Sequence, residues 1–162
     1  MMSPAAPRAI ELTSPFGWSA SVDVAGVVTL RDPAGQPRAT YQGTASSSPT
    51  AALPRGGTHT VRLPDGDVAL HNGATRAARR RDHDGHLDLH GRRYVFHHTW
   101  GWNTEVRCDG VRVALLHRRT SRRFTVRTDA TRDETDRLAM ALCWFAVQPG
   151  REGAIAAAFH GL

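Results

Sequence analysis

Short segments in which apolar and polar residues alternate make up most of the chain, and turn sequences separate them. In the segment "WSASVDV", the apolar residues Trp18, Ala20 and Val22 alternate with small or acidic polar ones. This period of two predicts a strand with one buried and one solvated face. Later in the chain the turn sequences recur about every 8–12 residues, a spacing typical of antiparallel sandwiches and barrels. The pattern predicts about twelve strands before the C-terminal region, and therefore a mainly β protein.

The region around Asp109–Gly110 gives the most specific strand and turn signals. Both residues tolerate the positive φ that a type I′ hairpin turn requires. In the preceding strand, Trp102, Thr104, Val106 and Cys108 fall on one face and charged or polar residues on the other. By contrast, residues 43–57 are rich in Ser, Pro and Gly and predict a long, mobile loop.

The stretch "LAMALCWFAV", Leu138 to Val147, contains only apolar residues. Acidic residues precede it, and either Thr131 or Asp133 is suited to cap a helix that spans about residues 132–148. A helix without a polar stripe must be covered on every side. We therefore expect the strands to form a closed antiparallel barrel around it, and we expect Trp144→Asp to prevent folding because the charge would be buried without a partner.

Length and composition favour a single domain. The chain has 162 residues, of which 40% are hydrophobic and 22% charged, and we expect a flexible tail at 1–7 followed by one domain at 8–162. The apolar stretch is much shorter than the roughly 20 residues that span a bilayer. The N-terminal region has no apolar run typical of a signal peptide, and two cysteines do not indicate a disulfide scaffold. These features favour a cytoplasmic protein.

The strand count, the acidic start of the helix and "LAMALCWFAV" together resemble the tubby C-terminal-like superfamily, which includes the phospholipid scramblases and the LURP-one-related proteins. The resemblance covers residues 8–148 and carries no residue motif. It implies a hydrophobic C-terminal helix that threads a closed β-barrel, and a basic patch that binds phosphoinositide headgroups. The alternatives are a helix-grip fold, which expects a longer amphipathic helix, and a lipocalin-like barrel with an external helix.

Arginine supplies all of the basic charge. The chain has a formal net charge of +6, a sequence pI of about 10.8, and 21 basic residues without a lysine. Arginine binds phosphate and carboxylate groups in a bidentate manner, so this balance favours anionic partners, although abundant Ala, Gly and Arg are also typical of a GC-rich genome. The candidate anion-binding residues are Arg79, Arg81, Arg118, Arg119, Arg122, Arg123 and Arg127.

Anionic membrane lipid is the partner that we expect, with the protein associating peripherally with the membrane. Nucleic acid is less favoured because the aromatic residues fall mostly on apolar faces, whereas single-stranded nucleic acid binds to exposed aromatic side chains. The sequence indicates neither protein partners nor an oligomeric state.

A histidine-rich segment, "RRRDHDGHLDLHGRR", suggests an alternative chemistry. His83, His86, Asp88 and His90 are residue types that bind metals. Alternate residues of a strand lie about 7 Å apart, however, and rarely converge on one ion. No G-x-S-x-G, P-loop or G-x-G-x-x-G motif is present, so we predict no cofactor and no catalytic residue. The first hypothesis is a non-enzymatic binding domain, and the alternative is a small-molecule or metal-dependent enzyme that uses the histidine cluster.

Overall fold

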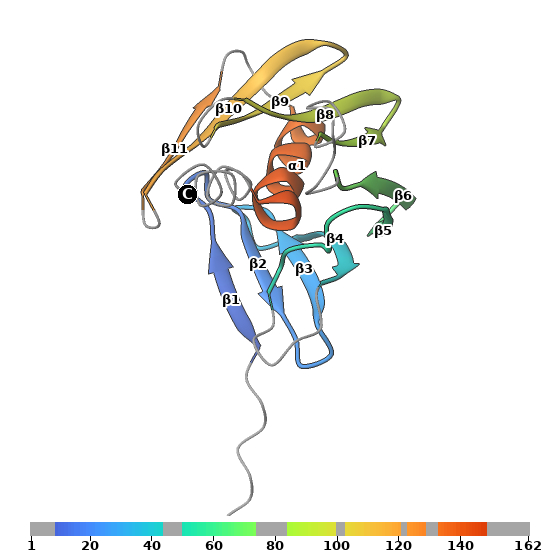
Figure 1. The fold of residues 1–162 in the computed structure, drawn as a ribbon. Coiled ribbons are helices and arrows are strands. Elements are labelled where there is room, and N and C mark those ends of the chain that lie inside the picture. The colour runs from blue at the N-terminus through green and yellow to red at the C-terminus, as the bar shows by residue number, and fades with distance from the viewer. Residues whose placement is uncertain are drawn as a thin grey trace, which may run out of the picture.

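The computed structural model describes residues 9–43, 50–73, 84–99, 103–120, 123–128 and 133–148, and the side chains of the same residues except 118–120 and 123–128. Eleven strands and a C-terminal helix make up these residues (Figure 1). The strands are β1 (Ile10–Thr13), β2 (Ser19–Val22), β3 (Val27–Arg31), β4 (Pro37–Gln42), β5 (Thr58–Leu63), β6 (Gly66–His71), β7 (Gly85–Leu89), β8 (Arg92–His98), β9 (Asn103–Cys108), β10 (Val111–Thr120) and β11 (Arg123–Thr128). The helix consists of α1 (Glu134–Leu142) and a π-helical end, η2 (Cys143–Val147).

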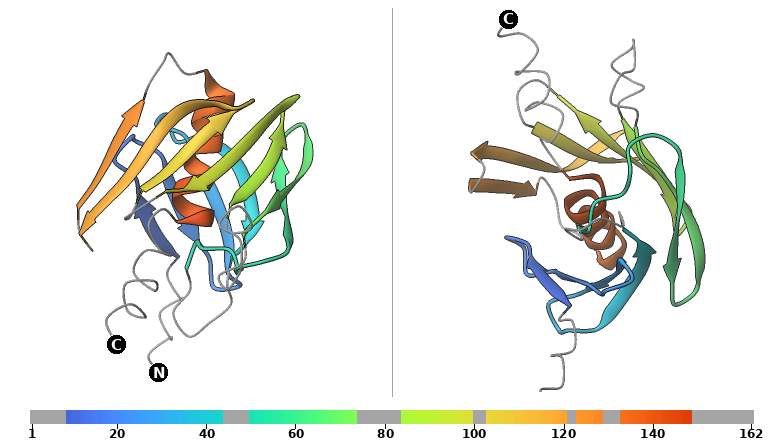
Figure 2. Two further views of the ribbon diagram at one scale, coloured as in Figure 1. Left: turned by 45° about the horizontal axis from the view of Figure 1, so that its top comes forward. Right: turned by 60° about the horizontal axis from the view of Figure 1, so that its bottom comes forward.

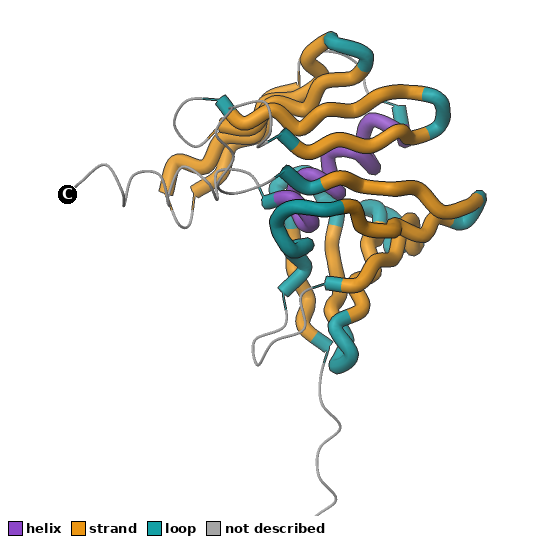
Figure 3. The backbone as a smooth tube through the Cα atoms, turned by 45° about the vertical axis from the view of Figure 1, so that its right-hand side comes forward, coloured by secondary structure: helices purple, strands orange, loops and turns teal. Residues whose placement is uncertain are grey.

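The strands form one antiparallel sheet in which each strand pairs with its neighbours in sequence, from β1 to β11. The sheet curls around the helix, as the view along the helix in Figure 2 and the tube in Figure 3 show. Among the described residues, β1 pairs only with β2 and β11 only with β10, so the sheet is not closed. The mainly β fold is confirmed, whereas the closed barrel of about twelve strands is not. The segment 75–81, which we expected to be one of the twelve, lies outside the described residues.

The predicted burial of the helix is confirmed. Nine of the ten residues of "LAMALCWFAV" are buried, and Leu142 is completely inaccessible. Strand residues from across the sheet, such as Leu30, Leu87 and Phe96, belong to the same core cluster. Trp144 is the exception, since it is only half-buried and its ring packs edge-on against Phe16, with ring centroids 6.1 Å apart.

Local hydrogen bonds define where the helix begins and where it ends. Asp133 is the N-cap, and its side chain accepts a hydrogen bond from the backbone N–H of Asp136, which satisfies one of the donors that a helix start leaves open. At the other end, the backbone N–H of Gln148 donates to the carbonyl oxygen of Cys143, five residues earlier, which is the π-helical spacing. Gln148 then has a φ of 63° and ends the helix.

Three residues of the predicted mobile loop are buried in the structure. Ala51, Ala52 and Leu53 are buried, and the backbone N–H of Leu53 donates to the carbonyl of Ala146 in η2. The hydroxyl of Tyr41 donates to the carbonyl of Ala51. Residues 51–53 of the predicted loop are therefore buried, and Leu53 contacts the C-terminal end of the helix.

The predicted strand faces and hairpin turn are found. Thr104 and Val106 point into the core, as do Trp18, Ala20 and Val22 of the first half of the sheet. Asp109 and Gly110 have φ values of 48° and 86° and connect β9 to β10, as a type I′ turn requires.

The paired strands share ladders of different lengths, and two of these ladders are short. We call these two strand junctions, β4–β5 and β6–β7, the short seams of the sheet. Among the described residues, two register pairs join β4 to β5 and two join β6 to β7, whereas the β5–β6 hairpin has six. A short ladder has few backbone hydrogen bonds. The sheet is therefore held together at these seams mainly by the side chains that meet there.

Truncating a helix residue tests the enclosed core. We expect Leu142→Ala to lower the free energy of unfolding by about 2–5 kcal/mol, the cost of a cavity in a packed core, and Leu142→Asp to prevent folding because a charge is buried without a partner. Trp144→Asp is expected to cost less than Leu142→Asp, because Trp144 is only half-buried. Denaturant unfolding followed by tryptophan fluorescence measures these differences.

Val24→Ala is the matched control for the truncation. Val24 is 65% exposed, so its truncation is expected to change the free energy of unfolding by no more than about 0.5 kcal/mol. If Leu142→Ala were as harmless as Val24→Ala, the helix would not be the centre of the core.

Candidate functional site

The densest group of charged side chains surrounds the start of the helix. Arg92 on β8 forms ion pairs with Asp133 at 2.6 Å and with Asp136 at 3.4 Å. Asp136 is buried, and the hydroxyl of Tyr94 also donates to it. Burial and the nearby carboxylate raise the pKa of Tyr94 far above its usual range, so the phenol is a neutral donor. We call these four residues the helix-entry cluster. It satisfies a buried carboxylate and fixes β8 to the helix.

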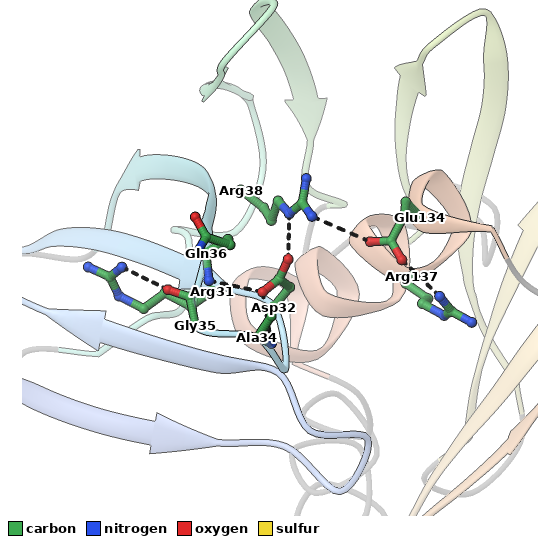
Figure 4. Close-up of polar contacts among 8 residues, drawn as sticks. All are labelled: Arg31, Asp32, Ala34, Gly35, Gln36, Arg38, Glu134 and Arg137. Atoms are coloured by element: carbon green, nitrogen blue, oxygen red, sulfur yellow. Dashed lines mark hydrogen bonds and ion pairs between the residues drawn. The ribbon is translucent and has the colours of Figure 1, made fainter.

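A second set of contacts joins the β3–β4 turn to the same end of the helix (Figure 4). Asp32 accepts hydrogen bonds from the backbone of Ala34 and Gln36 and from Nε of Arg38, the last at 2.7 Å. Arg38 in turn lies 4.0 Å from Glu134 in the first turn of α1. Burial alone would raise the pKa of Asp32, but these backbone and arginine contacts outweigh it and lower the pKa.

On the outer face of the sheet, three more arginines are paired with carboxylates. Glu105 on β9 forms ion pairs with Arg107 at 2.6 Å and with Arg112 at 3.5 Å. Arg93 on β8 lies 2.8 Å from Asp88 on β7. These arginines have structural partners, so they are less available to an external anion.

The positive charge is unevenly distributed along the chain. The residues with described side chains contain nine arginines and twelve acidic residues, which gives them a formal charge of −3. The remaining residues contain twelve arginines and only three acidic residues, so they contribute +9 to the total of +6. The basic character of the chain therefore comes entirely from the connecting and terminal segments and the end of the β10–β11 hairpin.

The structure places four of the predicted anion-binding residues on strands. Arg118 and Arg119 lie on β10, and Arg123 and Arg127 lie on β11. In the register, Arg118 is opposite Phe124, and Thr120 is opposite Arg123. The hairpin backbone therefore brings Arg118, Arg119 and Arg123 to neighbouring positions near its turn. The other candidates, Arg79, Arg81 and Arg122, lie outside the described residues.

The predicted histidine cluster is divided between two places. His86 and Asp88 lie on β7, whereas His90 lies in the turn after it with a φ of 50°. Nδ1 of His90 is 2.9 Å from the hydroxyl of Thr135, and its Nε2 is 3.0 Å from Asp65, so His90 connects two turns to the helix. His83 lies outside the described residues. No three His, Cys, Asp or Glu side chains form a metal-binding group in the described part of the chain.

The sequence analysis missed two side-chain pairs on the outer face. His71 and His86 lie opposite each other on β6 and β7. Nδ1 of His97 on β8 is 2.7 Å from Asp84, the residue immediately before β7. Both pairs join residues of separate segments, so spacing along one strand gave no signal of them. Only the register of the hairpins would have revealed them.

The two cysteines are free thiols. Burial raises the pKa of Cys143 far above its usual range, and burial also raises the pKa of Cys108. Because the thiolate is the reactive form, these environments suit core packing and do not activate a nucleophile.

Comparison of the chain with protein-family models, with curated proteins and with solved structures finds no match. In the part of the chain that the structure describes, no helix is both long and apolar enough to cross a membrane.

The helix-entry cluster makes a prediction about acid stability. The hydrogen bond from Arg92, with that from the backbone of Asp136, lowers the pKa of Asp133 from 3.8 to about 2. A carboxyl whose pKa is lower in the folded state stabilises the fold above its unfolded pKa and loses this contribution as the pH falls through the folded pKa. We therefore expect the melting temperature to fall between about pH 4 and pH 2 in part through Asp133.

Two variants distinguish the contribution of the Arg92–Asp133 ion pair to stability from that of the helix cap. Asp133→Ser keeps a capping oxygen but loses the charge, so its melting temperature is expected to depend less on pH over the same interval. Asp133→Ala loses the cap as well and is expected to be about 1 kcal/mol less stable at neutral pH than the serine variant. An unchanged pH dependence in both variants would contradict the assignment.

Proposed function

We propose that the protein is a non-enzymatic domain that binds a polyanionic surface, in the first instance anionic membrane lipid, through the arginines at the end of the β10–β11 hairpin. The observation that carries this proposal is the division of charge. The described arginines beside Glu105, Asp88 and the helix start have carboxylate partners, whereas the hairpin sequence from 118 to 127 contains five arginines and no acidic residue.

The helix fills the space inside the curled sheet, which supports ligand binding on the outer surface of the domain. Leu142, Ala139 and Ala141 of the helix have no accessible surface, so the helix occupies the space that the sheet surrounds. An enzyme of the helix-grip type would need a cavity between sheet and helix. Of the described histidines of the alternative hypothesis, His86 lies on the outer face of β7, and His90 lies in a turn, where it contacts Thr135 and Asp65.

The order of the elements supports a tubby-like architecture as part of the proposal. An antiparallel sheet that curls around a hydrophobic C-terminal helix fits that resemblance. A closed barrel would further require a junction between β1 and β11. In this proposal, the basic hairpin takes the part that the phosphoinositide-binding patch has in that superfamily.

Liposome flotation tests the proposal. The protein is mixed with phosphatidylcholine vesicles that contain about 30% phosphatidylserine and, separately, with vesicles of phosphatidylcholine alone. Each arginine near an anionic membrane surface contributes about 1 kcal/mol to the free energy of binding. We expect binding to the anionic vesicles only, and we expect it to weaken as salt rises and screens the charges. The triple variant Arg118→Gln, Arg119→Gln, Arg123→Gln is expected to bind roughly 100-fold more weakly.

A control variant with the same change of charge shows whether the position matters. Arg62→Gln, Arg93→Gln, Arg107→Gln removes three arginines from β5, β8 and β9 and is expected to retain most of the binding. Equal losses in the two triple variants would indicate an effect of net charge alone. If the protein binds neither kind of vesicle at low salt, the lipid proposal is wrong, and binding to duplex DNA instead would replace lipid by nucleic acid.

A further inference from the structure

Two histidines face each other across the outer surface of the short β6–β7 seam. The seam has one inward pair, Leu70 and Leu87, both buried in the core, and one outward pair, His71 and His86. The centroids of the two imidazole rings lie 4.7 Å apart, and the ring planes are inclined by 31°. Both side chains are half-buried, so the adjacent strands hold the rings close together.

The separation of the rings matches that of two imidazoles bound to one metal ion. Imidazole nitrogen is a preferred ligand of Zn²⁺, Ni²⁺ and Cu²⁺. Two imidazoles that bind an ion at about 2.1 Å, at roughly 100° to each other, have ring centres about 5 Å apart. The observed 4.7 Å shows that the two strands already hold the rings at this distance, and turning the rings out of their present arrangement, in which their planes are inclined by 31°, would direct one nitrogen of each ring to a common ion.

Asp88 lies two residues after His86 on the same face of β7. Asp88 is itself paired with Arg93 at 2.8 Å. On the other ring, the hydroxyl of Thr58 lies 3.4 Å from Nδ1 of His71, and in the tautomer in which Nδ1 donates to this hydroxyl, Nε2 has the lone pair that binds an ion.

We propose that His71 and His86 form a two-histidine binding site for a divalent transition-metal ion such as Ni²⁺, Cu²⁺ or Zn²⁺, with water or an external ligand in the remaining coordination positions. The bound ion would connect β6 to β7 where, among the described residues, two register pairs join them. Metal binding would thereby stabilise the sheet at one of its two short seams. This site is independent of the arginine hairpin and of the proposed lipid binding.

Titration calorimetry of the full chain with NiCl₂ at neutral pH tests the site. We expect binding that is lost, or at least tenfold weaker, in both His71→Ala and His86→Ala. His97→Ala is the matched control, because His97 also lies on the outer face but is paired with Asp84, and we expect it to bind nickel as the unmodified protein does. MgCl₂ is expected to give no binding, since Mg²⁺ prefers oxygen ligands.

Thermal unfolding gives a second measurement. At a nickel concentration about 100-fold above the dissociation constant, the melting temperature is expected to rise by about 5–10 °C, and by much less in either alanine variant. Circular dichroism confirms that each variant is folded before the comparison. Nickel binding that persists in both variants, or no binding by the unmodified protein at millimolar nickel, would overturn the proposal.

Discussion

Covering an apolar helix on every side is the constraint on which the other features of the fold depend. Each large apolar side chain that is fully buried contributes about 1.5–3 kcal/mol, and nine of ten consecutive helix residues are buried. A partly exposed ion pair contributes only about 0–1 kcal/mol, so the contacts of Arg38 and Arg92 position the helix but do not hold the domain together. The curl of the sheet and the buried segment at 51–53 both follow from the need to enclose the helix.

Arginine has two different roles in this chain. Within the described structure it neutralises carboxylates, as Arg107 and Arg112 do for Glu105. In the hairpin sequence around Arg118 and Arg123 it has no acidic neighbours in sequence. A count of basic residues does not distinguish arginines that are paired within the fold from arginines that could bind an external anion. The overall pI is therefore a poor guide to where an anion would bind.

Much of the fold could be predicted because period-two alternation and turn sequences are local signals. They located the strands, the Asp109–Gly110 turn and the buried helix. Closure of the sheet could not be predicted, since it depends on whether β1 and β11 meet, and no local pattern encodes that. For the candidate site, alternation correctly placed His86 and Asp88 on one strand face, but His90 turned toward the helix, and the partner of His86 proved to be His71 on another strand. Cross-strand neighbours depend on register, which the sequence specifies only through its turns.

The position of the helix after the strands has a consequence for synthesis. Every described strand pairs with its neighbour in sequence, so hairpins can form one after another as the chain leaves the ribosome, at about 5–20 residues per second. The inward faces of these hairpins have no core, however, until Leu138 to Val147 has been made. The nascent sheet therefore exposes its apolar face until the helix has been made, and the core is complete only when this last described element emerges. A pause of the ribosome just before the helix codons would prolong this exposure.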